Sequence, residues 1–168
     1  RYHKVTGVQT CALPISILLL TSCNTEDDVM EIFIGKTWKL TYISTENSHT
    51  QYNFWNNDQE SEQSFNALKQ SDTFIVTFEG TDLNGITGGT FNAKGIKATI
   101  NGQWNANGEN HEMQTSSIQI SSTETDKLAQ AFITGFQNVI RYDGDSSNLY
   151  IYYEDKDKSI KRMNFKAQ

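Results

Sequence analysis

Side chains that could bind a metal or act as nucleophiles are few in this chain and widely spaced. His49 and His111 are separated by most of a domain, and neither has a second ligand at the spacing of a zinc site. The segment 143–148 alternates oxygen-bearing side chains as a calcium loop does, but it lacks the closing glutamate, which favours a plain turn. The sequence has no nucleophile elbow, phosphate-binding loop or dinucleotide fingerprint. We therefore expect no catalytic residues, no metal site, no cofactor and no enzymatic activity.

The segment 51–58 is the best candidate for ligand binding. Its aromatic residues Tyr52, Phe54 and Trp55 alternate with amides and a carboxylate. Aromatic rings stack on a sugar or an apolar side chain, and neighbouring polar groups fix the orientation of the ligand. The alternative interpretation is that Phe54 and Trp55 cover the open end of a β structure as part of its core.

Cys23 has a predicted chemical role of a different kind. An apolar run over 17–20 leads into two small residues, Thr21 and Ser22, and then into this cysteine. The arrangement resembles the lipobox that ends a bacterial lipoprotein signal, in which the cysteine sulfur takes a diacylglycerol and the chain is cut just before it. We expect Cys23 to be the lipid anchor, so that the protein is attached to a membrane without a spanning helix.

Residues 24–28 are largely acidic, and we interpret 23–30 as an acidic tether. An acidic run directly after the acylated cysteine is similar to the export signal of some Gram-negative lipoproteins. It favours the cell outer membrane, with the domain facing the exterior; a plain solvated tether is the alternative.

The residues before this motif do not resemble a signal peptide. Residues 1–15 resemble a sequencing adapter translated in one frame, and we interpret 16–22 as the remnant of the lipoprotein signal. A poor but genuine signal peptide is the alternative. We expect 1–22 to pack on nothing in the domain.

The charge of the remaining chain limits the classes of partner. Arg1 and Lys4 are the only charged residues before Cys23, so the chain from Cys23 onward has 12 basic and 20 acidic residues and a net charge of −8. This balance argues against nucleic acid as a partner. Cys11 lies in the segment to be removed, which leaves no pair for a disulfide. The length of 31–168 suits a single domain.

Hydrophobic spacing indicates a mostly β fold with one main helix. Alternation predicts strands at several places, and a second, shorter helix is expected near 60–70. The expected strands cover 36–43, 73–79, 85–91, 96–104, 112–121, 148–154 and 159–165. We expect the main helix over about 123–140. Its start is predicted by the capping-box pattern Ser121–Glu124, and an apolar stripe of Leu128, Phe132, Phe136 and Val139 follows. Asp28 is expected to cap a short helix over 29–34.

The order of these features is similar to the META domain of heat-shock-associated bacterial lipoproteins. An early Trp38, a glycine-rich strand at 88–91, and one helix that leads through a turn into 149–151 carry the resemblance, which covers about 34–165. It lacks the cysteines of the META pattern. The resemblance implies an α+β, mostly β fold, in which a curved antiparallel sheet or partial barrel packs on the main helix. A lipocalin-like closed barrel is the alternative architecture.

These observations favour a surface-exposed outer-membrane lipoprotein that acts as a non-enzymatic binding or envelope-maintenance module. The membrane would be reached through the N-terminal lipid, and the partner would be a glycan, a peptide or an envelope protein. Two alternatives stay open: a glycan-acting hydrolase, which needs converging carboxylates, and a protein inhibitor of a secreted enzyme.

Overall fold

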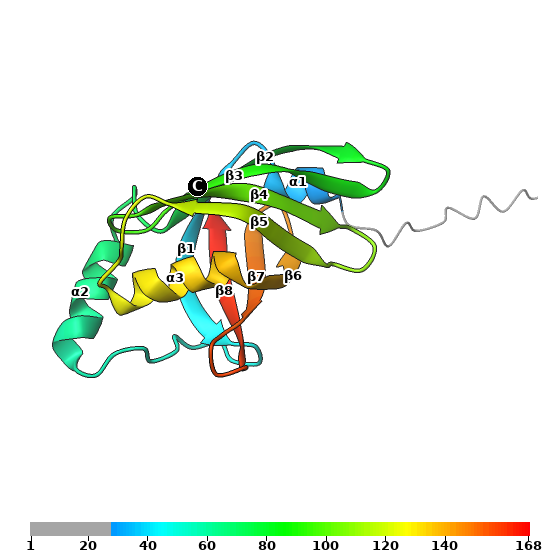
Figure 1. Cartoon of the computed structure of the whole chain (residues 1–168). Helices are drawn as coiled ribbons and strands as arrows, with labels where there is room; N and C mark the ends of the chain where they lie inside the picture. The colour runs from blue at the N-terminus through cyan, green and yellow to red at the C-terminus, as the bar shows by residue number, and fades with distance from the viewer. Residues whose placement is uncertain (1–27) are drawn as a thin grey trace, which may run out of the picture.

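The computed structural model describes residues 28–168, which form an α+β, mostly β fold, as predicted (Figure 1). Its three helices are α1 (Val29–Phe33), α2 (Asp58–Leu68) and α3 (Lys127–Gln137). Its strands are β1 (Thr37–Thr45), β2 (Ile75–Leu83), β3 (Ile86–Lys94), β4 (Thr99–Asn107), β5 (Met113–Ile120), β6 (Val139–Gly144), β7 (Asn148–Glu154) and β8 (Ile160–Ala167).

The strands form one antiparallel sheet in the order β5-β4-β3-β2-β1-β8-β7-β6. The sheet curls so that its two edge strands, β5 and β6, approach each other at one end only. There Glu112 and Arg141 form an isolated bridge, and the Tyr142 amide donates to the His111 carbonyl at 3.0 Å. The sheet does not close, so the closed-barrel alternative is wrong.

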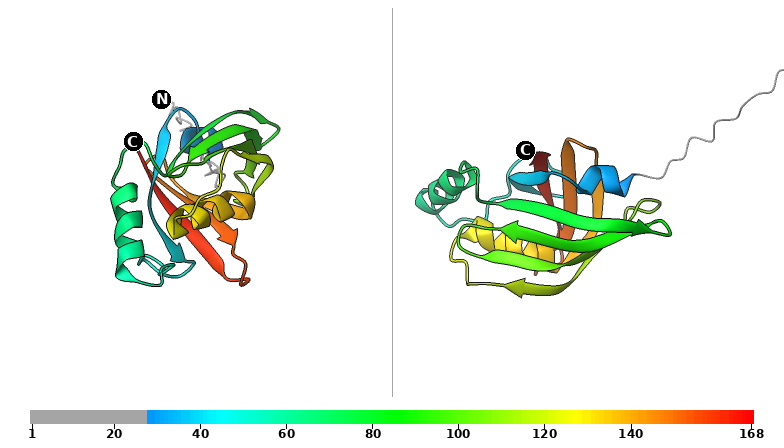
Figure 2. Two further views of the ribbon diagram at one scale, coloured as in Figure 1. Left: turned by 60° about the vertical axis from the view of Figure 1, so that its left-hand side comes forward. Right: turned by 90° about the horizontal axis from the view of Figure 1, so that it is seen from above.

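Helix α3 lies where the two edges diverge, inside the curl of the sheet (Figures 1 and 2). The Thr115 hydroxyl of β5 donates to the Phe136 carbonyl at 2.5 Å, which fixes the helix to that edge. Phe132 and Phe136 are fully buried and contact Phe165 on the opposite wall. The apolar stripe therefore covers the concave face of the sheet, as its spacing predicts.

The predicted bounds of this helix, 123–140, are too wide at both ends. Asp126, rather than a residue of the capping-box pattern, caps α3 by accepting from the Ala129 amide at 2.9 Å. The Glu124 side chain instead accepts three amide hydrogens from the β3–β4 turn, so the local pattern has a long-range partner. At the other end Asn138 ends the helix, and Ile140 lies at a bulge in β6.

Helix α1 packs beside β2 at the opposite end of the sheet from α2 (Figures 1 and 2). Asp28 caps it through the Glu31 amide, as expected, and Val29 is buried although the predicted tether 23–30 includes it. The expectations for 1–15, for 16–22 and for Cys23 lie outside the described residues. Within residues 28–168, no helix is long and apolar enough to cross a membrane.

Candidate functional site

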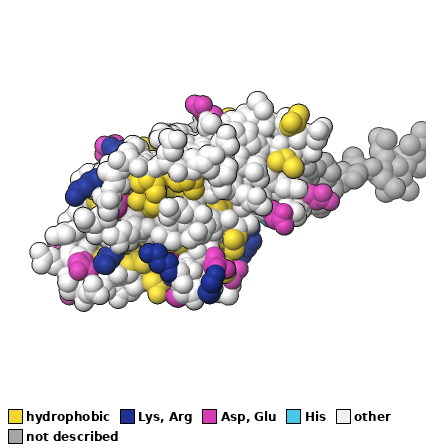
Figure 3. Space-filling model, in the orientation of Figure 1, with side chains coloured by type: hydrophobic (Ala, Val, Ile, Leu, Met, Phe, Trp, Pro, Cys, Tyr) yellow, Lys and Arg dark blue, Asp and Glu magenta, His cyan; other side chains and the backbone are white. Residues whose placement is uncertain are grey.

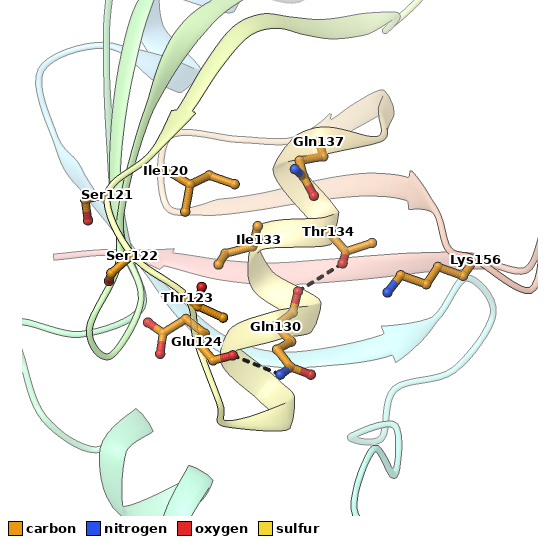
Figure 4. A pocket seen from close by; sticks show the side chains of 10 residues that line it. All are labelled: Ile120, Ser121, Ser122, Thr123, Glu124, Gln130, Ile133, Thr134, Gln137 and Lys156. Atoms are coloured by element: carbon orange, nitrogen blue, oxygen red, sulfur yellow. Dashed lines mark hydrogen bonds between the residues drawn. The ribbon is translucent and has the colours of Figure 1, made fainter.

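The candidate site is a groove between the end of β5 and one face of α3, with a volume of about 610 Å³ (Figure 4). This volume falls in the range of ligand-binding sites. Ile120 of β5 and Ile133 of α3 form facing walls of the groove, and both side chains are partly exposed. The groove is the gap left where the edge of the unclosed sheet turns away from the helix.

The backbone of β5 faces this groove with an unpaired edge. The Ser121 amide donates to the carbonyl of Thr99, the first residue of β4, at 3.0 Å. Ile120 stands opposite Ile100 in the same pair of strands. Because residues of an antiparallel pair alternate between bonded and outward-facing positions, the N–H and C=O of Ile120 point away from β4. No helix or strand in the described part of the chain takes up these two groups. A bulge at Ser117, where φ is 53°, limits the usable edge to the residues that follow it.

The polar side chains of the groove are amides and hydroxyls rather than reactive pairs. Gln130 donates to the Glu124 carbonyl at 2.9 Å, and the Thr134 hydroxyl donates to the Gln130 carbonyl at 3.0 Å. Gln137 lies further along the same helix face (Figure 4). Such groups can bind the backbone or side chains of a ligand, and they have no means of activating a nucleophile.

Glu124 and Lys156 are the two charged residues of the lining. The Glu124 side chain is 2% exposed, and its Oε1 accepts from the amides of Ile96, Lys97 and Ala98 at 2.7–2.8 Å. Its Oε1 therefore fixes the β3–β4 turn, while Oε2 is buried without a hydrogen-bond partner among residues 28–168. Lys156 lies at the rim, and its ammonium forms no ion pair within residues 28–168. The groove consequently favours neutral or acidic ligands.

The structure places the predicted ligand-binding rings outside this groove. Tyr52 packs edge-on against Phe54 at 4.8 Å, and Trp55 packs against Phe65 of α2 at 4.9 Å. The Trp55 indole donates to the Ser64 hydroxyl at 2.7 Å. Phe54 and Trp55 pack against the core, as the alternative interpretation predicts. Ligand binding by the three rings stays a prediction.

A buried charge lies beneath Tyr52. The Lys161 ammonium is 4.4 Å from the centre of that ring, and it forms an ion pair with Asp155. Burial, followed by the nearby carboxylates, raises the pKa of the adjacent Tyr153 hydroxyl far above its usual range, so this phenol stays protonated. This cluster holds the β7–β8 turn against the aromatic segment.

Two arginines lie on the outer face of β6 and β8, where both guanidinium groups approach Tyr152. Arg141 stacks on that ring at 3.5 Å and pairs with Glu46 at 2.5 Å. Arg162 donates to the Ser48 carbonyl at 2.9 Å. Both contacts tie the segment after β1 to the sheet, and no sequence pattern marks either arginine.

Among residues 28–168, no group of three or more His, Cys, Asp or Glu side chains could hold a metal ion. The arrangement is that of a small curled β domain with a helix in its opening and a groove beside that helix.

The chain belongs to the family described as Domain of unknown function (DUF4847), whose pattern matches residues 24–167. A similar solved structure is the crystal structure, at 1.00 Å resolution, of a DUF4847 family protein from Bacteroides vulgatus ATCC 8482. The two chains share 22% sequence identity, with a TM-score of 0.57 over 82% of this chain and 96% of the other. At this identity the likeness shows the fold alone. No curated protein matches the chain.

This family membership overturns the predicted META resemblance. The features that carried it were the order of a tryptophan, a glycine-rich strand and a helix. These features describe a curved antiparallel sheet packed on one helix, and a fold by itself does not identify a family or a function. The fold prediction survives because it depended on those physical features.

The groove is not predicted by any pattern in the sequence. One signal was available, since Ile133 stands out on α3 as an apolar residue one position beyond the predicted stripe. Its position beside the free edge of β5 depends on the curl of the sheet, which no local pattern encodes.

Proposed function

We propose that the protein is an outer-membrane lipoprotein, anchored through Cys23 and exposed at the surface, whose domain is a non-enzymatic binding module. Its ligand is a short extended segment of a peptide or envelope protein, which adds as a strand to β5 in the groove. The observation that carries the proposal is the unpaired backbone edge at Ile120 beside the apolar side chain of Ile133. Strand addition uses the free edge for affinity and a neighbouring pocket for specificity.

The lining favours a peptide over a glycan at this groove. No aromatic ring lies among the residues that line it, whereas sugar binding relies on stacking against aromatic faces. Amide and hydroxyl side chains on α3 suit a polypeptide backbone. Lys156 at the rim favours a segment with acidic residues.

The geometry of the domain supports presentation away from a membrane. The described chain begins at α1, at one end of the sheet, and the groove lies toward the other end (Figure 1). A lipid on Cys23 would therefore leave the groove open to the exterior. The hydrolase alternative is disfavoured at this groove because Glu124 is the only carboxylate among its lining residues, whereas glycoside hydrolysis relies on a pair of carboxylates.

The binding test is a library of immobilised octapeptides probed with soluble Cys23→Ala protein. Ile133→Asp places a charge in the groove and should weaken binding to the selected peptides by about tenfold or more, since burying one aliphatic side chain contributes roughly 1.5–3 kcal/mol. Leu83→Asp, at an exposed apolar position far from the groove, is the matched control and should bind like the parent. Equal binding by both variants would contradict the proposal.

The anchoring test uses cells that carry a complete signal peptide ahead of Cys23. We expect the parent to partition with the outer membrane and into detergent, and Cys23→Ala to appear in the soluble fraction. Unchanged detergent partitioning of the Cys23→Ala protein would refute the lipid anchor.

A further inference from the structure

The β2–β3 hairpin ends in two exposed aliphatic side chains. Leu83 is 74% exposed and Ile86 is 49% exposed, and the two residues pair across the hairpin. Asn84 and Gly85 make the turn between them, both with positive φ (57° and 80°), as a tight two-residue hairpin requires. The turn is fixed in shape, so the two side chains project together from its tip.

These two residues are the most exposed large apolar side chains among residues 28–168. The core accounts for neither of them, since the aromatic side chains of β2 and β3 that face inward are buried further back, at Phe78 and Phe91. Apolar side chains held together at the tip of a structured hairpin indicate a contact with another surface.

The position of the tip indicates which surface that is. The tip lies at the end of the domain from which the described chain begins, beside α1 (Figures 1 and 2), and hydrophobic side chains stand out on the surface at this end (Figure 3). Only four residues lie between Cys23 and Asp28, so the two residues can be at most about 18 Å apart. A lipid on Cys23 therefore holds this end of the domain against the bilayer.

We propose that the β2–β3 tip, through Leu83 and Ile86, inserts into the lipid surface beside the acyl anchor. This inference rests on the proposed lipid anchor at Cys23 and adds a second, protein-made contact that sets the orientation of the domain. The charged residue next to the tip, Asp82, is acidic and would be repelled by anionic headgroups. The contact is therefore made by the aliphatic side chains with the apolar part of the bilayer. Insertion at this end directs the groove between β5 and α3 outward.

The test uses acylated full-length protein reconstituted in phosphatidylcholine vesicles. An environment-sensitive NBD label is attached at Leu83→Cys in one sample and, as a control, at Asn66→Cys on exposed α2 at the far end. We expect a blue shift of emission and quenching by doxyl-labelled lipid for the label at position 83, and neither effect at position 66. Adding Ile86→Asp to the Leu83→Cys protein should abolish the shift, whereas Ile86→Val should preserve it.

The outcomes separate this inference from the anchor on which it rests. Protein that floats with the vesicles but whose label at position 83 emits as it does in buffer overturns the tip contact and leaves the anchor standing. Protein that does not float with the vesicles overturns both. A blue shift that appears in unacylated Cys23→Ala protein without vesicles, and that grows with protein concentration, would show that a second copy covers the tip, which also overturns the inference.

Discussion

Phe136→Ala tests whether α3 holds the curled sheet together. Phe136 is fully buried, stacks on Phe91 at 5.1 Å and meets Phe132 edge-on at 5.1 Å. Removing a buried phenylalanine costs about 3–5 kcal/mol, and the two ring pairs place this site in the upper half of that range. A domain of this size has a total stability of about 5–15 kcal/mol, so the loss is a large fraction of it.

The assay is thermal and urea unfolding followed by circular dichroism. A loss of about 4–5 kcal/mol corresponds to a fall in Tm of roughly 8–20 °C, at about 2–4 °C per kcal/mol. Ile133→Ala is the matched control, because it places the same alanine on the same helix but on the groove face, and it should cost about 1 kcal/mol. If the melting curve of Phe136→Ala overlays that of the parent, the stripe does not pack on the sheet and the account of α3 is wrong.

Two further predictions concern carboxylates. Glu124→Ala should lower the free energy of unfolding by about 3 kcal/mol because it leaves three turn amides without an acceptor. Glu124→Gln keeps one acceptor oxygen and should cost less. Equal urea midpoints for the parent and Glu124→Ala would contradict this prediction. The amides of Ser147 and Asn148 hold the pKa of Asp145 below its ordinary 3.8, so its contribution to stability is fully present above about pH 5 and is lost as the pH falls through the lowered value. Asp145→Asn should therefore flatten the acid limb of a pH–stability profile, and an unchanged limb would count against that role.

The fold could be predicted from the sequence to the extent that its signals are local. Alternation at Trp38 and Leu40 places inward-facing residues correctly, and the spacing of Phe132 and Phe136 identifies the buried face of α3. Asp28 is read correctly as a cap because a cap and its amide lie three residues apart.

The errors have a common physical origin in long-range contacts. The capping-box pattern assigned Glu124 to its own helix, but its partners lie 26–28 residues earlier in the chain. Ile140 fits the helical stripe, yet the bulge between Val139 and Arg141 places it in β6. The groove depends on how far β5 and β6 diverge, a property of the whole sheet.

The most direct test of the proposed function is hydrogen exchange of the β5 amides, with and without a saturating concentration of the tightest library peptide. We expect the Ile120 amide, which has no partner among residues 28–168, to gain protection when the peptide adds as a strand. Protection at Tyr52–Trp55 with Ile120 unchanged would contradict the account and place binding at the aromatic segment instead.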